Sequence, residues 1–349
     1  MNAPEGQVFD LGYRHYEGHR EGRSRARKSL FVNGIRTCFG LGRGAWAKVL
    51  PMLFLVSVMA PAAVLSVMAG LLGEVFADAL NLPGPQDYYE IVSPILLIFA
   101  AIIAPELLCP DRRNGVIDLY LVRPLSSNDY VLSRWLSFFA VSLVFIYAGQ
   151  VVLLAGLVLG SQEPLDYLGD NWAHVPRFLA AGLVIAAVTT TIPLAAASLT
   201  TRRAYASLAV IGLFVISTVV VGVLSSVECI TASGQERGGT DQSESNAASS
   251  RINLTVTSRE VEEEDESEPD DASIVCETQF GFAGKWARLI DFGGIPLQVS
   301  DLIFGTYEEE LTSEDSDIRL PAPITVLWWA VVVAVPAAIL WNRYRRLVT

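Results

Sequence analysis

Long stretches without charge restrict the fold of this chain more than any other feature. Five runs free of Asp, Glu, Lys, Arg and His each exceed 20 residues. A helix of about 20 apolar residues crosses the hydrocarbon layer of a bilayer, which is roughly 30 Å thick. Within that layer every backbone polar group must be paired internally, which favours helices. The sequence therefore predicts an all-α, polytopic membrane protein.

We expect six transmembrane helices, five of them in the long runs. The spans expected in these runs cover residues 49–73, 135–160, 178–201, 204–227 and 323–341, the last within the uncharged run 320–342. The remaining run, residues 91–105, would rise only about 22 Å as a helix. It spans a bilayer only if the residues on either side extend the helix, and it is the least secure of the six.

Charge is distributed unevenly, and the distribution predicts the orientation. The net charge is −12, but residues 228–320 alone carry −16 and the rest of the chain +4. Segments 74–90 and 161–176 contain no base, whereas segment 106–134 contains four Arg. Bases mark cytoplasmic loops, so we expect a multi-pass cell-membrane protein with both termini in the cytoplasm. The acidity belongs to one loop, and we predict no nucleic-acid partner.

Four regions follow from these patterns. Residues 1–48 form a basic cytoplasmic segment whose apolar residues recur at helical spacing, which favours an interfacial helix on the inner leaflet, with a disordered tail as the alternative. Residues 49–227 hold helices one to five, with a charged cytoplasmic loop at 106–134. Residues 321–349 hold helix six and a basic tail.

The fourth region, residues 228–320, is a long acidic extracytoplasmic loop between helices five and six. Its first half, residues 231–273, is rich in Ser, Gly, Glu and Asp, which favours disorder. Its second half is apolar enough to predict one or two short amphipathic helices resting on the outer surface. Cys229 and Cys276 both lie in this loop, where they either pair in a disulfide or remain as two free thiols.

Several kinds of chemistry lack their residues in this sequence. The only histidines are His15, His19 and His174, no HExxH or Walker loop is present, and the four Cys have no metal-like spacing. We therefore expect no enzymatic activity, no cofactor and no metal site. No Asp, Glu, Lys, Arg or His lies inside the six runs, which argues against proton coupling, so energy must come from another protein.

Two features inside the runs concern helix packing. Gln150 lies in the middle of the third run, where an interhelical hydrogen bond is favoured over contact with a substrate. The GxxxG pattern of residues 156–160 is a weak indication of close helix contact, since glycine is common in membrane spans.

The charged loop reads Asp-Arg-Arg at 111–113, Asn-Gly at 114–115, an apolar stretch at 116–122 and Pro-Leu-Ser at 124–126. This order resembles the most recognisable segment of the membrane subunits of type-2 ATP-binding-cassette (ABC) exporters. The phrases FDLGYRHYEG and FGLGRGAWAKVLP are also similar to members of this family. The long acidic loop departs from the family's usually compact outer loop.

The resemblance implies a permease subunit, an exporter without catalysis of its own. Its partners would be a cytoplasmic ABC ATPase that docks on loop 106–134, a second copy or a related permease, and membrane lipid. The docking candidates are Arg112, Arg113, Gly115, Asp118, Arg123 and Pro124, and guanidinium groups suit carboxylates at an interface.

Two alternatives remain open. The arginines of the loop either dock the ATPase or serve only to fix topology or bind anionic lipid. The alternative to a permease for the chain as a whole is a membrane anchor or scaffold whose acidic extracellular loop binds a partner.

Overall fold

A computed structural model describes residues 22–42, 44–79, 87–121, 125–161, 163–224, 227–231, 274–278, 286–306 and 320–346. Within these residues, six helices are long and apolar enough to cross a membrane, as predicted. They are α2 (Ala45–Ala79), α3 (Tyr88–Arg113), α5 (Ser127–Gly160), α7 (His174–Leu199), α8 (Arg203–Leu224) and α12 (Ala322–Arg345).

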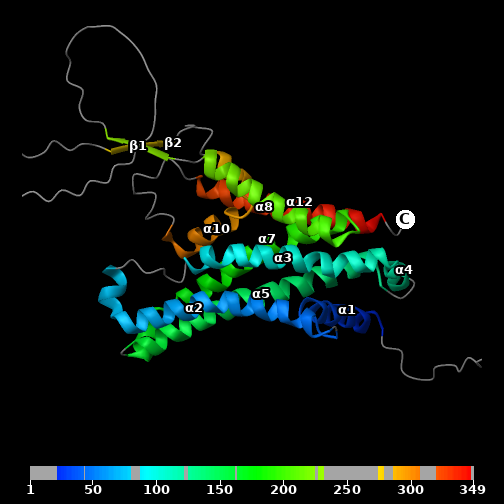
Figure 1. The fold of residues 1–349 in the computed structure, drawn as a ribbon, viewed down its shortest axis with the longest axis horizontal. Coiled ribbons are helices and arrows are strands. Elements are labelled where there is room, and N and C mark those ends of the chain that lie inside the picture. Colours follow the sequence, from blue (N-terminus) through cyan, green and yellow to red (C-terminus); the bar gives the residue numbers. More distant parts are fainter. Residues whose placement is uncertain are drawn as a thin grey trace, which may run out of the picture.

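The long helices form one bundle with two different ends (Figure 1). One end carries α1 (Arg23–Cys38), α4 (Val116–Leu121) and the start of α8, and we call it the basic end. The other carries α10 (Ile295–Phe304) and the beginning of α3, and we call it the acidic end. The short elements α6 (Pro164–Asp170) and η1 (Arg288–Ile290) belong to connections on that second side.

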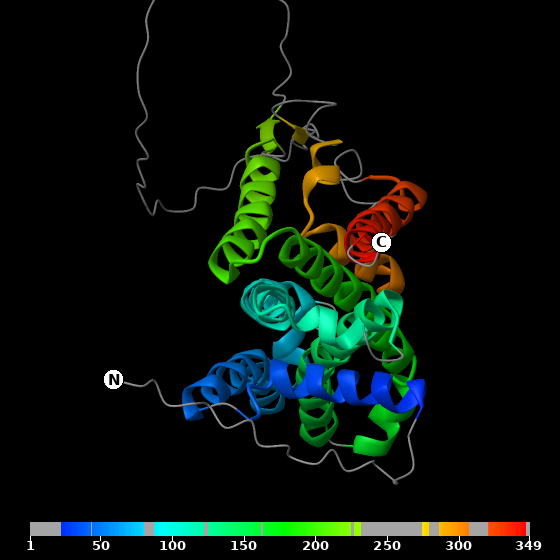
Figure 2. The ribbon, with the colours of Figure 1, turned by 90° about the vertical axis from the view of Figure 1, so that its right-hand side faces the viewer.

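The six long helices differ in how much of each is buried inside the protein. Helices α3 and α7 lie in the middle of the bundle, α2 packs along α5, and α8 and α12 lie on the outside (Figure 2). Helix α1 crosses the basic end and packs mainly against α5 through Leu30, Gly34 and Cys38. The predicted N-terminal helix is therefore present, and it is held by protein contacts.

Small residues allow a close helix approach between α2 and α5. A Cβ atom added at Gly156 would lie 2.1 Å from Cβ of Ser66, and one at Gly160 would lie 3.1 Å from Cα of Gly70. These distances leave no room for larger side chains. The GxxxG pattern is thus a close helix contact, which in lipid is how packing stabilises a helix pair.

Three features differ from the sequence expectations or add to them. Helix α3 continues to Arg113 and α5 begins at Ser127, so most of segment 106–134 extends the two helices. A short helix, α10, lies in the second half of the acidic loop, and its buried residues pack against α7 and α12. A two-stranded antiparallel pair, β1 (Val227–Thr231) with β2 (Ile274–Thr278), accompanies the helices. The stretch predicted to be disordered lies almost wholly outside the described residues.

Candidate functional site

The basic end gathers the charged segment between the second and third spans together with α1. Helix α3 ends at Arg113, the chain turns at Asn114 and Gly115, and α4 follows. Gly115 has a φ of +64°, a left-handed conformation that favours glycine. This turn redirects the chain and presents α4 beside α1.

The start of α5 is fixed by a capping box. The Ser126 hydroxyl accepts a bond from the Asp129 N–H at 3.3 Å, and the Asp129 carboxylate accepts one from the Ser126 N–H at 3.1 Å. The same carboxylate accepts a bond from Nε of Arg23 at 2.6 Å, and Nη1 of Arg27 lies 3.8 Å away. The hydrogen bond to Asp129 raises the pKa of Arg23, so this guanidinium stays charged. The start of α1 is thereby held to the start of α5.

A buried ion pair ties three spans together just below this surface. Nη2 of Arg134 donates to Oδ2 of Asp111 at 2.6 Å, and the Tyr130 hydroxyl donates to the same oxygen at 2.8 Å. The Arg134 side chain is only 3% exposed. The ring of Tyr344 from α12 lies 5.4 Å from the Tyr130 ring. These contacts connect the end of α3 to α5 and, through the two tyrosine rings, to α12.

Arg112 is engaged within the chain. Its guanidinium donates to the carbonyls of Ser198 and Thr200 at the C-terminal end of α7, the latter at 3.4 Å. A helix C-terminus attracts a cation through its free carbonyls and its dipole. Nearby, Arg203 of α8 forms an ion pair with Glu106 of α3. Arg112 is thus an internal brace, a role that the sequence did not reveal.

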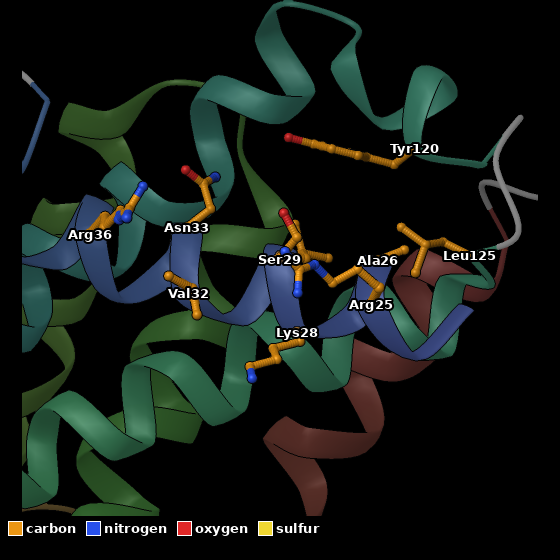
Figure 3. Close-up of a pocket in the computed structure, with 10 residues that line it drawn as sticks. Arg25, Ala26, Lys28, Ser29, Val32, Asn33, Arg36, Tyr120 and Leu125 are labelled. Atoms are coloured by element: carbon orange, nitrogen blue, oxygen red, sulfur yellow. The ribbon is translucent and has the colours of Figure 1, made fainter. Parts of the chain in front are cut away.

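A groove of about 600 Å³ opens between α1 and the α4 segment (Figure 3). Tyr120 reaches from α4 across this space toward α1, and Leu125 faces Ala26. The described residues that line it include three exposed bases of α1, namely Arg25, Lys28 and Arg36, and no acid. The groove is therefore suited to an anionic partner. The basic character of residues 1–48 is evident in the sequence, but the position of these bases opposite α4 is not.

The six docking candidates are not all brought together. Arg113 and Gly115 are exposed at the α3–α4 turn, while Arg112 is turned inward. Asp118 lies in α4, but its side chain is outside the described part of the structure, as are Arg123 and Pro124 altogether. In the strand pair, Cys229 and Cys276 are register partners on the backbone.

Within the described residues, no group of three or more His, Cys, Asp or Glu side chains is placed to hold a metal ion. Burial raises the pKa of the Cys38 thiol to about 12, so Cys38 is a packing residue and a poor nucleophile.

Comparison with known proteins agrees with this geometry. Residues 41–259 match the family described as ABC-2 family transporter protein. No curated protein matched the chain. The matched region begins just before α2 and contains five of the six long helices together with the α3–α4 turn. Since it covers more than half of the sequence, the chain belongs to the ABC-2 family, as a membrane permease component of a transporter.

Proposed function

We propose that this permease exports its cargo using ATP hydrolysed by a separate ATPase subunit that docks at the basic end. The observation that carries the proposal is the groove between α1 and α4, which has three bases and no acid among its described lining residues. An acidic surface on the ATPase complements that charge, and desolvated charge pairs at an interface give specificity. Tyr120 and Leu125 supply apolar contact area beside the bases.

The connections behind the groove support a mechanical role. A displacement of α1 would act on α5 through the ion pair of Arg23 and Asp129, in which Nε and Oδ2 are 2.6 Å apart. A displacement of the α3–α4 turn would act on α5 through the ion pair of Asp111 and Arg134, and on α7 through the hydrogen bonds of Arg112. Both routes end on long helices of the bundle, so a docking partner that closes on ATP would shift the bundle as a unit. We infer that two permease copies, or this chain and a related one, work as a pair.

Charge reversal in the groove tests the docking proposal. The double variant Lys28→Glu and Arg36→Glu should lower co-purification of the ATPase by about tenfold or more, as expected when attraction becomes repulsion at an interface. Arg113→Glu should give a smaller loss. The matched control is Arg177→Glu, an exposed base on α7 at the acidic end. If all variants retain the partner and its ATP turnover, the groove is not the docking site.

We propose that the basic end faces the cytoplasm and the acidic end the outside. The bias of bases supports this orientation. Cys38 and Cys109 are buried, so labelling needs introduced thiols, at the exposed residues Asn114 and Glu163, in a chain with Cys229 and Cys276 changed to Ser. A membrane-impermeant maleimide applied to intact cells should label Glu163→Cys and leave Asn114→Cys unlabelled. The reverse pattern would invert the orientation.

We also infer that Cys229 and Cys276 form a disulfide. Their register in the β1–β2 pair supports it, because cross-strand neighbours have backbones close enough to be bridged. Closing a loop of this length would stabilise the folded state by about 4 kcal/mol in the chain-entropy picture. Mass spectrometry of peptides from the unreduced protein should find the two cysteines linked. Alkylation of both without prior reduction would show free thiols.

A further inference from the structure

A crevice at the acidic end is separate from the docking groove. It opens between α3 and α8 and is bordered by the turn that precedes α10. Its volume is about 420 Å³, within the range of roughly 300–1,000 Å³ usual for small-molecule sites. The walls are mainly apolar and include Leu97 and Ile98 of α3, Ile211, Phe214 and Val215 of α8, and Leu297 of α10.

The mouth of this crevice is polar and mostly acidic. A second cavity of about 350 Å³ adjoins it and shares Glu90, Thr218 and Asp291 with it. Among the residues that the structure describes, the charged ones that line this second cavity are three carboxylates, Glu90, Asp291 and Asp301, and one base, Arg288. The mouth therefore carries an excess of negative charge.

The turn at residues 291–294 holds this mouth close to both helices. The Gly293 N–H donates to Oδ1 of Asp291 at 3.2 Å, which orients the carboxylate. A Cβ atom added at Gly293 would lie 3.7 Å from Leu97 and 3.9 Å from Thr218. Asp291 is therefore presented at the junction of α3, α8 and the turn.

The crevice has an acidic mouth and apolar walls, and this order matches the polar head groups and apolar tails of a bilayer leaflet. Glu90 lies in the first turn of α3, where a span meets the interface, and the apolar walls continue from it along the span. An alkyl chain fits between α3 and α8, and a cationic head fits beside the carboxylates through charge-assisted hydrogen bonds. We propose that this crevice binds an amphiphile with a protonated amine head group. As a statement about cargo, this rests on the proposed transport function.

Photolabelling of the full chain in phosphatidylcholine nanodiscs tests the proposal. The probes are a long-chain alkyl amine that carries a diazirine and the matching alkyl carboxylic acid. The amine should label α3 and α8 peptides about fivefold more strongly, as expected for partly exposed ion pairs. Equal labelling by the two probes would overturn the proposal.

Matched variants separate charge from shape. Glu90→Gln with Asp291→Asn should abolish the preference for the amine, whereas Glu163→Gln at the same end should not. Thr218→Trp should fill the crevice and reduce labelling by both probes, whereas Ile216→Trp, which is on the same helix and 64% exposed, should not. Unchanged labelling in Thr218→Trp would contradict the assigned site. Thermal unfolding checks that each variant is folded.

A second arm identifies the source of the amphiphile. Nanodiscs with phosphatidylethanolamine present an amine-headed bilayer lipid, and competition with the amine probe would assign the crevice to such a lipid. Absence of competition would assign it to a single-chain amine. The labelling needs neither ATP nor the ATPase, so its failure would leave the docking proposal intact, and a failure of docking would leave the labelling unchanged.

Discussion

The two central helices and the two outer helices are almost equally apolar, yet they are buried very differently. In their most apolar windows the mean hydropathy is 2.0 for α7 and 2.6 for α8, but 72% of the α7 window is buried against 22% of the α8 window. Helix α3 at 61% and α12 at 17% repeat the contrast. In lipid, hydrophobicity does not drive helices together, because the tails are as apolar as Leu. Hydropathy therefore detects which segments span the membrane, but not whether a span is surrounded by protein or by lipid.

The contrast between α7 and α8 follows side-chain size and polarity. Helix α7 is rich in Ala, Thr and Ser, and its hydroxyls meet partners on α5: Thr191 accepts from Nε1 of Trp135 at 3.0 Å. Helix α8 is rich in Val, Leu and Ile, and most of these point outward. Small residues permit close backbone approach and polar residues give interhelical bonds, so burial follows them.

The largest expected effect lies in the contrast between two ion pairs of α3, a buried one with α5 and a more exposed one with the outer helix α8. Asp111→Asn leaves the charge of Arg134 buried without its counter-ion, which costs about 3 kcal/mol or more. Glu106→Gln breaks the more exposed pair with Arg203 of α8, and such pairs contribute about 0–1 kcal/mol. Thermal unfolding in detergent should show a clear drop for the first variant and little change for the second. Equal drops would show that the buried pair contributes no more to stability than the more exposed pair.

Two glycines give the next test. A Cβ atom at Gly182 of α7 would lie 2.4 Å from the Tyr147 ring, whereas one at Gly212 of α8 meets nothing within 4 Å. Gly182→Leu should therefore destabilise the protein by about 1–3 kcal/mol through overpacking. Gly212→Leu should leave the melting temperature almost unchanged. A loss in Gly212→Leu that reached the loss in Gly182→Leu would mean that α8 is covered in the membrane, for example by a second copy.

The smallest effect concerns a single interhelical hydrogen bond. Thr191→Val keeps the shape of the side chain and removes the acceptor for Trp135, which should cost about 0.6–1.7 kcal/mol in a bilayer protein. On α8, Ser217→Ala removes only a bond to the carbonyl of Phe214 in the same helix, and the change should be smaller. The difference between the two melting temperatures measures what polarity adds to the central packing. If the Ser217 variant melts lower, that attribution is wrong.

The site was predictable only in part. Segment 106–134 could be located because four arginines between two apolar runs must lie outside the hydrocarbon. The individual roles could not, because Arg112 and Arg113 are neighbours in sequence but not in environment. Arg112 meets the end of α7, some 86 residues away, whereas Arg113 is exposed. Likewise, Arg25, Lys28 and Arg36 became groove residues only when α1 was placed against α4.

The sequence by itself determined the six spans and the alternation of charge between their connections, since the thickness of a bilayer and its exclusion of charge leave few other ways to thread such runs. The tertiary structure alone decided which spans lie inside, that α10 is packed into the bundle, and that Asp111 and Arg134 share a buried pair. The physical reason is that the number and order of the spans depend on the difference between water and lipid as surroundings. Each segment's own composition indicates which of the two it prefers. Packing depends on which small and polar residues meet across helices, and that is a property of pairs of segments.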